Sequence, residues 1–347
     1  MDVLKGGQND FFGLDLGSTG ARVVQLKATR PVKTLDRYGY TPIEGTAGVS
    51  DAKVDQKAVA DAVHGLVKRV GLTTKNVAVN LPSSRVFTAV TDWDKMPTED
   101  LAKTIRYQAE SIIPTSPAQS KLDWAVIGDS PNDPRKIEVL LSSVPNDFIE
   151  ARLDMLESIG LNVMAFEPDS FALTRSMIPP SAAAPQMVLD IGAAATDLVI
   201  AMAGVPHLAR AIPTGSQAIV RSAIQALNIE PGQAEQFVFK FGLSQDKLEG
   251  QIYNAILSTI DNLVAEIDKS IKFFQTRYQT AKVERVIVTG GASALPEFPV
   301  YLANKLGISV EIGNPWANVN FPAGRQNELL AVANHFAVAI GLAERTE

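Results

Sequence analysis

The sequence predicts an α/β protein of two similar lobes, with a smaller α+β subdomain inserted into the first lobe. Two observations indicate this organisation. The segment GLDLGSTGARVVQL at 13–26 recurs as VLDIGAAATDLVIA at 188–201, with Asp15 and Asp190 aligned 175 residues apart in a chain of 347. Strand and helix patterns alternate along both halves, and this length suits about two domains.

Each copy of the repeat predicts a β-hairpin. A short apolar run ends in Asp-x-Gly, passes through small residues and resumes as a second apolar run, and glycine permits the tight turn between them. Between the copies, IPPSAAAP at 178–185 has the prolines and small residues of a linker. We therefore expect lobe I at 1–178 and lobe II at 186–326.

The block at about 77–165 carries strands and helices of its own, which predicts an inserted subdomain within lobe I. A helix is expected at 98–112, because Pro97 precedes it and acidic residues fill its first turn, where the helix dipole favours them. A second helix is expected at 146–159. Apolar runs predict strands at 77–82, 86–93, 121–128 and 136–145.

Lobe II contains a helical insertion at about 217–280, followed by a strand at 285–291. Helices are expected at 216–228, 231–241 and 244–280. The longest of them has apolar residues every three or four positions, which is typical of a helix packed on one side. The segment 327–347 is expected to contain a final helix that packs back on lobe I.

Composition and charge exclude several classes of function. The chain has 32 Lys and Arg against 38 Asp and Glu, a net charge of −6, so it lacks the basic face of a nucleic-acid-binding protein. It has no Cys, and its three His lie far apart without metal-ligand spacing. The N-terminal residues do not resemble a signal peptide, and no apolar run approaches a membrane span. We expect a cytoplasmic protein that associates with a membrane only through a partner or an amphipathic surface.

Two Asp-x-Gly turns and one Gly-Gly pair together indicate a nucleotide site. Turns of small residues present consecutive backbone N–H groups to phosphate oxygens. Asp15 and Asp190 would face a Mg²⁺ ion, which needs only one or two carboxylates besides water and phosphate. Gly290 and Gly291, followed by Ala292, would let the nucleoside lie against the backbone. A single such turn would indicate no ligand, because strands often end in Asp and Gly for turn geometry alone.

These motifs resemble the actin, Hsp70 and sugar kinase superfamily of ATPases, built of two ribonuclease H-like lobes. Within it the chain resembles the PilM family of type IV pilus assembly proteins, relatives of the cell-division protein FtsA. The resemblance covers nearly the whole chain. The segments that narrow it to this family are IRYQAESIIPTSPAQSKLDWAVIG (105–128), EARLDMLESIGLNVMAFEPDSFALTRSM (150–177), EIDKSIKFFQTRYQTAKVERVIVTGG (266–291) and VEIGNPWANV (310–319).

The resemblance implies a cytoplasmic adaptor at the inner face of the cytoplasmic membrane that binds ATP with Mg²⁺. It would bind the N-terminal cytoplasmic tail of a PilN-type membrane protein, with pilus motor ATPases as further partners. The inserted subdomain would help to form the groove for that tail, where an extended peptide gains backbone hydrogen bonds and apolar anchors. Nucleotide state would be coupled to the membrane assembly complex.

The resemblance also assigns candidate residues to the nucleotide. Arg22 occupies the usual lysine position of the first phosphate loop, and Glu235 matches an acid that contacts the ribose, although Val238 stands where a lysine often accompanies it. The residues that match the two phosphate loops are Gly17, Ser18 and Thr19 in the first, and Gly192, Ala193, Ala194 and Thr196 in the second. Alanine in the second loop forbids most positive φ angles that glycine would allow.

Glu167 is the candidate catalytic residue. In FEPDSFAL it resembles the Glu-Pro of Hsp70-like ATPases, where the carboxylate positions the attacking water. The alternative is that Glu167 only ends a strand before a helix, and we expect weak or absent hydrolysis.

Two rival functions on the same fold are a small-molecule phosphotransferase of the sugar or acetate kinase class and an FtsA-like membrane tether.

Overall fold

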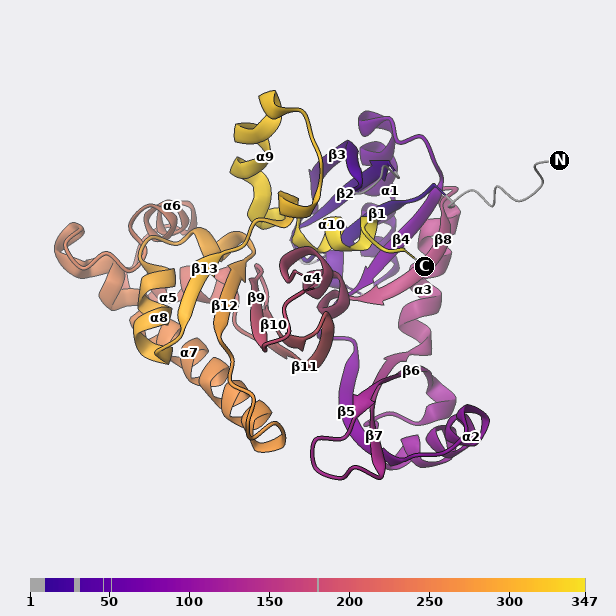
Figure 1. The fold of residues 1–347 in the computed structure, drawn as a ribbon. Helices are drawn as coiled ribbons and strands as arrows, with labels where there is room; N and C mark the ends of the chain where they lie inside the picture. The colour runs from indigo at the N-terminus through magenta and orange to yellow at the C-terminus, as the bar shows by residue number, and fades with distance from the viewer. Residues whose placement is uncertain (1–9, 28–31, 46, 51, 180, 347) are drawn as a thin grey trace. The chain divides into compact units, whose positions relative to one another are not determined.

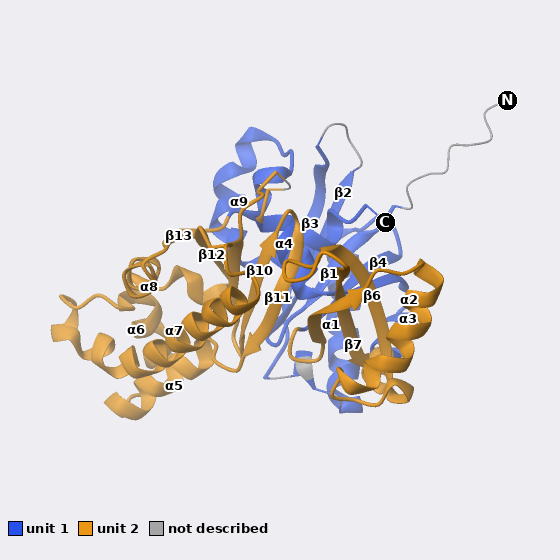
Figure 2. Ribbon diagram, turned by 60° about the horizontal axis from the view of Figure 1, so that its bottom comes forward, with its two compact units in different colours: residues 1–82, 150–177, 314–347 blue, residues 83–149, 178–313 orange. Residues whose placement is uncertain are grey.

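The computed structural model describes residues 10–346 apart from 28–31, 46, 51 and 180. The N-terminal segment judged above not to be a signal peptide therefore lies mostly outside the described residues. The chain forms two compact units, one of residues 1–82, 150–177 and 314–347 and the other of residues 83–149 and 178–313 (Figure 2).

The first unit contains a five-stranded sheet of order β3-β2-β1-β4-β8 (Figure 1). Strands β1 and β2 form the predicted hairpin, β3 extends it antiparallel, and β4 and β8 run parallel to β1. The strands are β1 (Phe12–Leu16), β2 (Gly20–Lys27), β3 (Thr34–Pro42), β4 (Asn76–Leu81) and β8 (Asn162–Pro168).

Helices cover both faces of this sheet. Alternation along β1 places Phe12, Leu14 and Leu16 in a core with the buried residues of α1 (Lys53–Val70). Its other face meets α10 (Ala337–Ala343), every residue of which is buried and which also contacts α4 (Asp169–Met177). A Cβ at Gly13 would collide with the α10 backbone, so this close approach requires glycine.

The C-terminal segment, predicted as one helix, consists of two helices. Helix α9 (Gln326–Val332) ends in a short 3-10 turn, and α10 begins at Ala337. Phe336 between them has φ −111° and ψ 6°, and its ring packs edge to face against Tyr38 of β3 at 5.3 Å. The break therefore coincides with an aromatic contact that a helical repeat does not reveal.

The second unit contains a five-stranded sheet of order β11-β10-β9-β12-β13, which repeats the first sheet strand for strand. Strands β9 and β10 form the second predicted hairpin, β11 pairs antiparallel with β10, and β12 and β13 run parallel to β9. The strands are β9 (Gln186–Ile191), β10 (Thr196–Met202), β11 (Val205–Ile212), β12 (Arg285–Thr289) and β13 (Ser309–Ile312). The duplication predicted from the repeat is confirmed.

Four helices share a hydrophobic core with this second sheet: α5 (Ser216–Leu227), α6 (Pro231–Phe241), α7 (Gln251–Arg277) and α8 (Phe298–Leu306). The predicted apolar stripe of α7 is buried in the core of the unit. The predicted start at 244 was wrong. Helix α7 begins at Gln251, because Leu248, Glu249 and Gly250 have positive φ angles of 47°, 52° and 73° and interrupt the helix.

The insertion forms a separate three-stranded sheet of order β5-β7-β6, which belongs to the second unit. Helix α2 (Thr98–Gln108) buries Leu101 and Ile105 against Val139 and Leu141 of this sheet. The strands are β5 (Phe87–Asp94), β6 (Ser120–Asp129) and β7 (Lys136–Pro145). Strands β4 and β8, at the two ends of the predicted 77–165 range, pair within the first sheet.

Helix α3 (Asn146–Ser158) leads from this sheet back to the first unit.

Among the helices of the described residues, none combines the length and the apolar character needed to cross a membrane.

Candidate functional site

The first Asp-x-Gly turn contains a buried ion pair. Asp15 lies directly opposite Arg22 in the β1–β2 register, and Arg22 Nη1 donates to Asp15 Oδ2 at 3.2 Å. Burial raises the pKa of Asp15, whereas the Arg22 charge and hydrogen bond oppose this shift. The Arg22 guanidinium also lies 5.4 Å from the ring centre of Tyr40. The turn thus carries a fixed cation beside its acid.

The backbone of this turn is closed by one hydrogen bond. Gly17 N–H donates to Gly20 O at 3.0 Å, and Ser18 and Thr19 lie half-buried between them. Thr19 O accepts from Ile43 N at 3.0 Å. Among the described residues, the N–H groups of Ser18 and Thr19 find no acceptor, so both can donate to a ligand.

The second turn repeats this closure. Gly192 N–H donates to Ala195 O at 3.0 Å, in the position that matches Gly17 and Gly20. The turn is also joined to the start of α5. Ser216 N donates to Gly192 O at 2.9 Å, and Gln217 N donates to Ala193 O at 3.0 Å. The two halves of the chain therefore share a turn as well as a sequence.

Alanine fits the second turn without strain. None of the alanines at 193–195 has a positive φ angle, so the Cβ atoms that the sequence analysis weighed against this loop meet no conformational penalty. Ala194 is exposed, and Thr196 Oγ1 donates to Thr214 O at 2.7 Å. The Thr196 hydroxyl thus positions the end of the turn.

The charges of the two turns differ. Asp190 lies directly opposite Asp197 in the β9–β10 register, at the position where Asp15 faces Arg22 in the first hairpin. Both aspartates are half-buried. The first turn thus combines an acid with a cation, and the second presents two acids.

The structure brings the Gly-Gly pair next to the second turn. In the β12–β9 register Thr289 lies opposite Asp190, and Gly290 follows with φ 84°. A Cβ at Gly290 would collide with Asp190 Oδ1, so the backbone passes directly over the carboxylate. Gly291 begins a 3-10 turn (Gly291–Ala294) in which Ala292 is buried and Ser293 Oγ donates to Gly290 O at 2.7 Å.

The proposed ribose acid lies on α6. Glu235 is exposed, whereas Val238 is fully buried in the core of the second unit. The position where a lysine often stands is therefore occupied in this chain by a core residue, Val238. Gly242, which ends α6, lies so close to Pro296 that a side chain there would collide with it, and α6 therefore ends beside the loop that follows Gly291.

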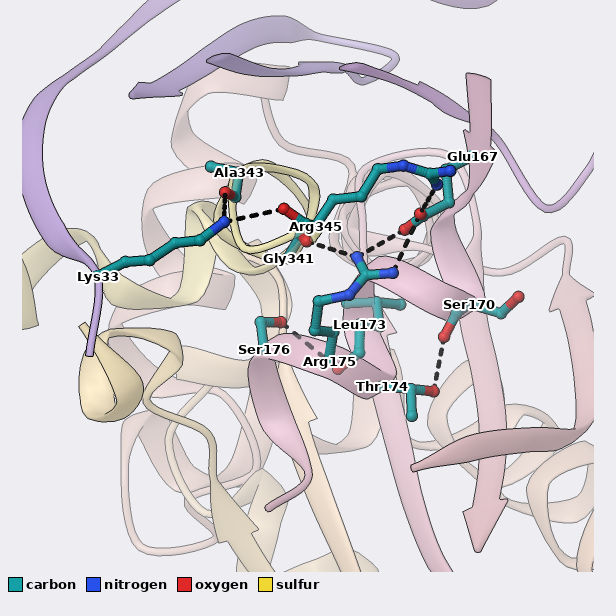
Figure 3. Close-up of polar contacts among 10 residues, drawn as sticks. All are labelled: Lys33, Glu167, Ser170, Leu173, Thr174, Arg175, Ser176, Gly341, Ala343 and Arg345. Carbon is teal, nitrogen blue, oxygen red and sulfur yellow. Dashed lines mark hydrogen bonds and ion pairs between the residues drawn. The ribbon is translucent and has the colours of Figure 1, made fainter. Parts of the chain in front are cut away.

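Glu167 ends β8 in the first unit and is held by two arginines (Figure 3). Arg175 Nη1 and Nη2 donate to Glu167 Oε1 and Oε2 at 2.8 and 3.1 Å, and Arg345 Nη1 donates to Oε2 at 2.6 Å. The Glu167 side chain is only 4% exposed. Both oxygens are thus occupied, which leaves this carboxylate poorly placed to orient a water molecule.

Three residues of these sites were not predicted from the sequence: Asn80, Arg175 and Arg345. Buried Asn80 accepts from Leu16 N at 2.7 Å and donates to Asp169 Oδ1 at 3.0 Å, and so joins the end of β1 to the start of α4. A polar residue in the apolar run VAVNLP was the available signal. Arg175 lies eight residues after Glu167, whereas Arg345 is 178 residues away and gave no local signal.

A magnesium nucleotide fits these residues better than an all-protein metal site does. Within the described part of the chain, no group of three or more His, Cys, Asp or Glu residues could hold a metal ion. Mg²⁺ needs only one or two carboxylates when phosphates and water complete its coordination. Gly290 allows its backbone to pack against Asp190, which places this carboxylate beside the Gly-Gly pair.

Comparison with known proteins supports the fold. A solved structure titled as the PilM-PilN type IV pilus biogenesis complex is similar with a TM-score of 0.83 and 23% identity, over 98% of this chain and 99% of that one. The ethanolamine utilization protein EutJ from Carboxydothermus hydrogenoformans matches with a TM-score of 0.58 and 16% identity, over 96% and 88%. MreB5 of Spiroplasma citri bound to ADP matches with a TM-score of 0.56 and 12% identity, over 96% of this chain and 95% of that one. The predicted actin-like ATPase fold is confirmed.

The family resemblance rests on a match along nearly the whole chain. The model of the family described as type IV pilus assembly protein PilM covers residues 13–347, from the first strand of the first hairpin to the end of the chain. The chain therefore belongs to the PilM family of type IV pilus assembly proteins.

Proposed function

We propose that this protein is a nucleotide-dependent adaptor of type IV pilus assembly. It binds ATP with Mg²⁺ through its two Asp-x-Gly turns, and it binds the N-terminal cytoplasmic tail of a PilN-type membrane protein. The observation that carries the proposal is the repeated turn. Gly17 to Gly20 and Gly192 to Ala195 close with the same hydrogen bond, and each follows a strand that ends in Asp-x-Gly.

Each turn supplies part of a phosphate site. The N–H groups of Ser18 and Thr19 are open to an acceptor, and Arg22 adds a cation beside them. In the second turn Asp190 lies against the backbone of Gly290, so the carboxylate and the Gly-Gly pair belong to the same part of the proposed site. When bound, Mg²⁺ would neutralise part of the phosphate charge near Asp15 and Asp190. The similar fold of MreB5 holds ADP, which supports nucleotide as the ligand class.

Nucleotide would act as a structural ligand with slow turnover. A carboxylate assists hydrolysis when it can accept a proton or orient water at hydrogen-bonding distance. In this chain both oxygens of Glu167 accept from arginines. We therefore expect binding to set the conformation of the protein, through the difference in affinity of ATP for its open and closed states.

The partner is inferred from the family and from the similar PilM-PilN complex. A short cytoplasmic tail of a membrane protein would hold this chain at the inner face of the membrane, and pilus motor ATPases are further candidate partners. An extended peptide gains affinity from backbone hydrogen bonds and from apolar anchors. The inserted subdomain is the proposed location of the groove for this tail.

Peptide affinity with and without nucleotide tests the proposal. A synthetic, fluorescently labelled peptide with the sequence of a PilN-type N-terminal tail is titrated with the protein in buffer, in MgADP and in MgATP. We expect the dissociation constant to change at least about fivefold with MgATP, a typical allosteric coupling. Asp15→Ala and Asp190→Ala should each abolish that change. Equal peptide affinity in all three conditions would overturn the proposed coupling.

A further inference from the structure

Two acids face each other on the inserted sheet. Asp92 of β5 and Glu138 of β7 are directly opposite in the strand register, and the Glu138 side chain is only 4% exposed. Like charges opposite each other on neighbouring strands destabilise a sheet, and burial increases the cost. A cation at this place would stabilise the inserted sheet, and among its described residues none pairs with both acids.

The cation comes from the end of α7. Arg277 Nε donates to Glu138 Oε1 at 2.7 Å, and Arg277 Nη2 donates to Asp92 Oδ1 at 2.5 Å. One guanidinium thus bridges both acids, and its rigid fork suits this geometry better than a lysine would. The next residue strengthens the contact, because Tyr278 Oη donates to the same Glu138 oxygen at 2.8 Å.

A histidine on strand β11 of the same unit also lies close to Glu138. His207 of β11 has its Nε2 4.0 Å from Glu138 Oε2, and its ring packs edge to face on Tyr278 at 5.4 Å. His207 Nδ1 donates to Val205 O at 2.9 Å, which fixes the ring. Residues of β5 and β11 also lie near one another. Burial lowers the pKa of His207, so α7 supplies the bonds to Glu138, and β11 adds the ring contact with Tyr278.

Along the chain, the inserted sheet is connected at both ends to the first unit. The chain enters residues 83–149 from β4 and leaves them through α3 toward β8, and both β4 and β8 belong to the first sheet. The insertion is thus joined to the first unit by its two chain ends and to α7 by the ion pairs of Arg277.

We infer that Arg277 and Tyr278 clamp the inserted sheet, through Glu138 and Asp92, to the lobe that carries Asp190 and Gly290, so that the sheet moves with that lobe when nucleotide binds. The inference rests on the proposed function and deepens it. The peptide-binding subdomain would respond to nucleotide because its ionic contacts are to the second lobe, while its backbone connects to the first.

The coupling between nucleotide and peptide tests this clamp. Arg277→Met removes the bridging cation, and Lys272→Met removes an exposed cation of the same helix that pairs with Asp268 one turn away. We expect Arg277→Met to bind peptide and MgATP separately within about threefold of the wild type, while the effect of MgATP on peptide affinity falls below about twofold. Lys272→Met should keep the full effect.

A charge-free variant controls for misfolding. Arg277→Met alone leaves Glu138 buried beside a like charge, whereas the combination of Asp92→Asn, Glu138→Gln and Arg277→Met removes all three charges and should fold stably. It should also lose the coupling. If coupling persists in the charge-free variant, the inference is overturned.

Hydrogen exchange separates this inference from the proposed function. If the wild type shows no coupling at all, the proposed function fails and the clamp is judged by amide exchange alone. Arg277→Met should then increase exchange in 87–94 and 136–145 and leave the first sheet unchanged. Unchanged exchange in both inserted strands would overturn the clamp whatever the nucleotide does.

Discussion

Arg22 lies directly across the first hairpin from Asp15, with its Nη1 3.2 Å from the Asp15 Oδ2 atom. Both side chains are mostly buried. Burial raises the pKa of Asp15, and the neighbouring guanidinium offsets only part of this shift. The pair therefore places an acid and a cation side by side at the start of the turn, where the proposed magnesium nucleotide would bind.

Replacing Arg22 should destabilise the first unit. Arg22→Met leaves Asp15 buried without its cation, and we expect a loss of about 1–3 kcal/mol in the free energy of unfolding at pH 7. Arg22→Met with Asp15→Asn should recover most of it. Urea denaturation of the four proteins measures the interaction. Additive losses in the double variant would show that the two residues do not interact.

Replacing Gly290 should damage the second turn. Alanine at this φ of 84° is strained, and its Cβ would collide with Asp190. Gly307→Ala is the matched control, because Gly307 also has a positive φ, 66°, but a Cβ there meets no atom within 4 Å. We expect Gly307→Ala to lose about 1 kcal/mol of stability. Gly290→Ala should lose about 1–3 kcal/mol more and weaken MgATP binding. Equal losses would contradict the close approach to Asp190.

Arg345 should stabilise the fold through Glu167. Arg345→Gln removes one of two cations from a buried carboxylate, and we expect a loss of about 1–3 kcal/mol. Lys33→Met is a useful comparison, because Lys33 Nζ binds the carbonyls of Ala343 and Arg345 without touching Glu167. A cycle with Glu167→Gln should show coupling to Arg345 and none to Lys33. Stability is again measured by urea denaturation.

The pH dependence of stability should reveal Glu344. Burial raises its pKa from 4.5 to about 7, although the charges of Arg175 and Lys33 oppose the shift. The folded protein therefore holds this proton more tightly than the unfolded chain between pH 4.5 and 7. This group's contribution to stability is complete at low pH, falls as pH rises to about 7 and stays constant above it.

Glu344→Gln should remove that dependence. At pH 8 the variant should be more stable than the wild type by about 2–3 kcal/mol, and the difference should shrink toward pH 5. Chemical denaturation across this range measures both proteins. A constant difference between them would contradict a raised pKa at this position.

The fold could be predicted where signals are local or repeated. The two Asp-x-Gly hairpins were predicted because each turn lies within a few residues of its strands, and the repeat then implied a second sheet like the first. The start of α7 was predicted wrongly, because Leu248 and Glu249 adopt positive φ angles that their residue types do not suggest. The break at Phe336 was missed for a different reason, because it coincides with an aromatic contact to Tyr38 of β3 that a helical repeat does not reveal.

The surroundings of the candidate site depend on long-range contacts that the sequence does not reveal. Glu167 was recognised by its local motif, but its second cation, Arg345, comes from the end of the chain. The Arg277 bridge between Asp92 and Glu138 likewise needs the register of two strands and the end of a distant helix. The sequence thus indicated which residues are candidates for the site, but it did not indicate which oppositely charged residue pairs with each of them.

Calorimetric titration of MgATP tests the central claim most directly. The claim is that both Asp-x-Gly turns contribute to one magnesium nucleotide site. We expect the wild type to bind one MgATP per chain, and Asp15→Ala and Asp190→Ala each to weaken binding at least about tenfold, which corresponds to about 1.4 kcal/mol. If the wild type binds no nucleotide, or if only one of the two substitutions affects binding, the account of a site shared by the two halves is contradicted.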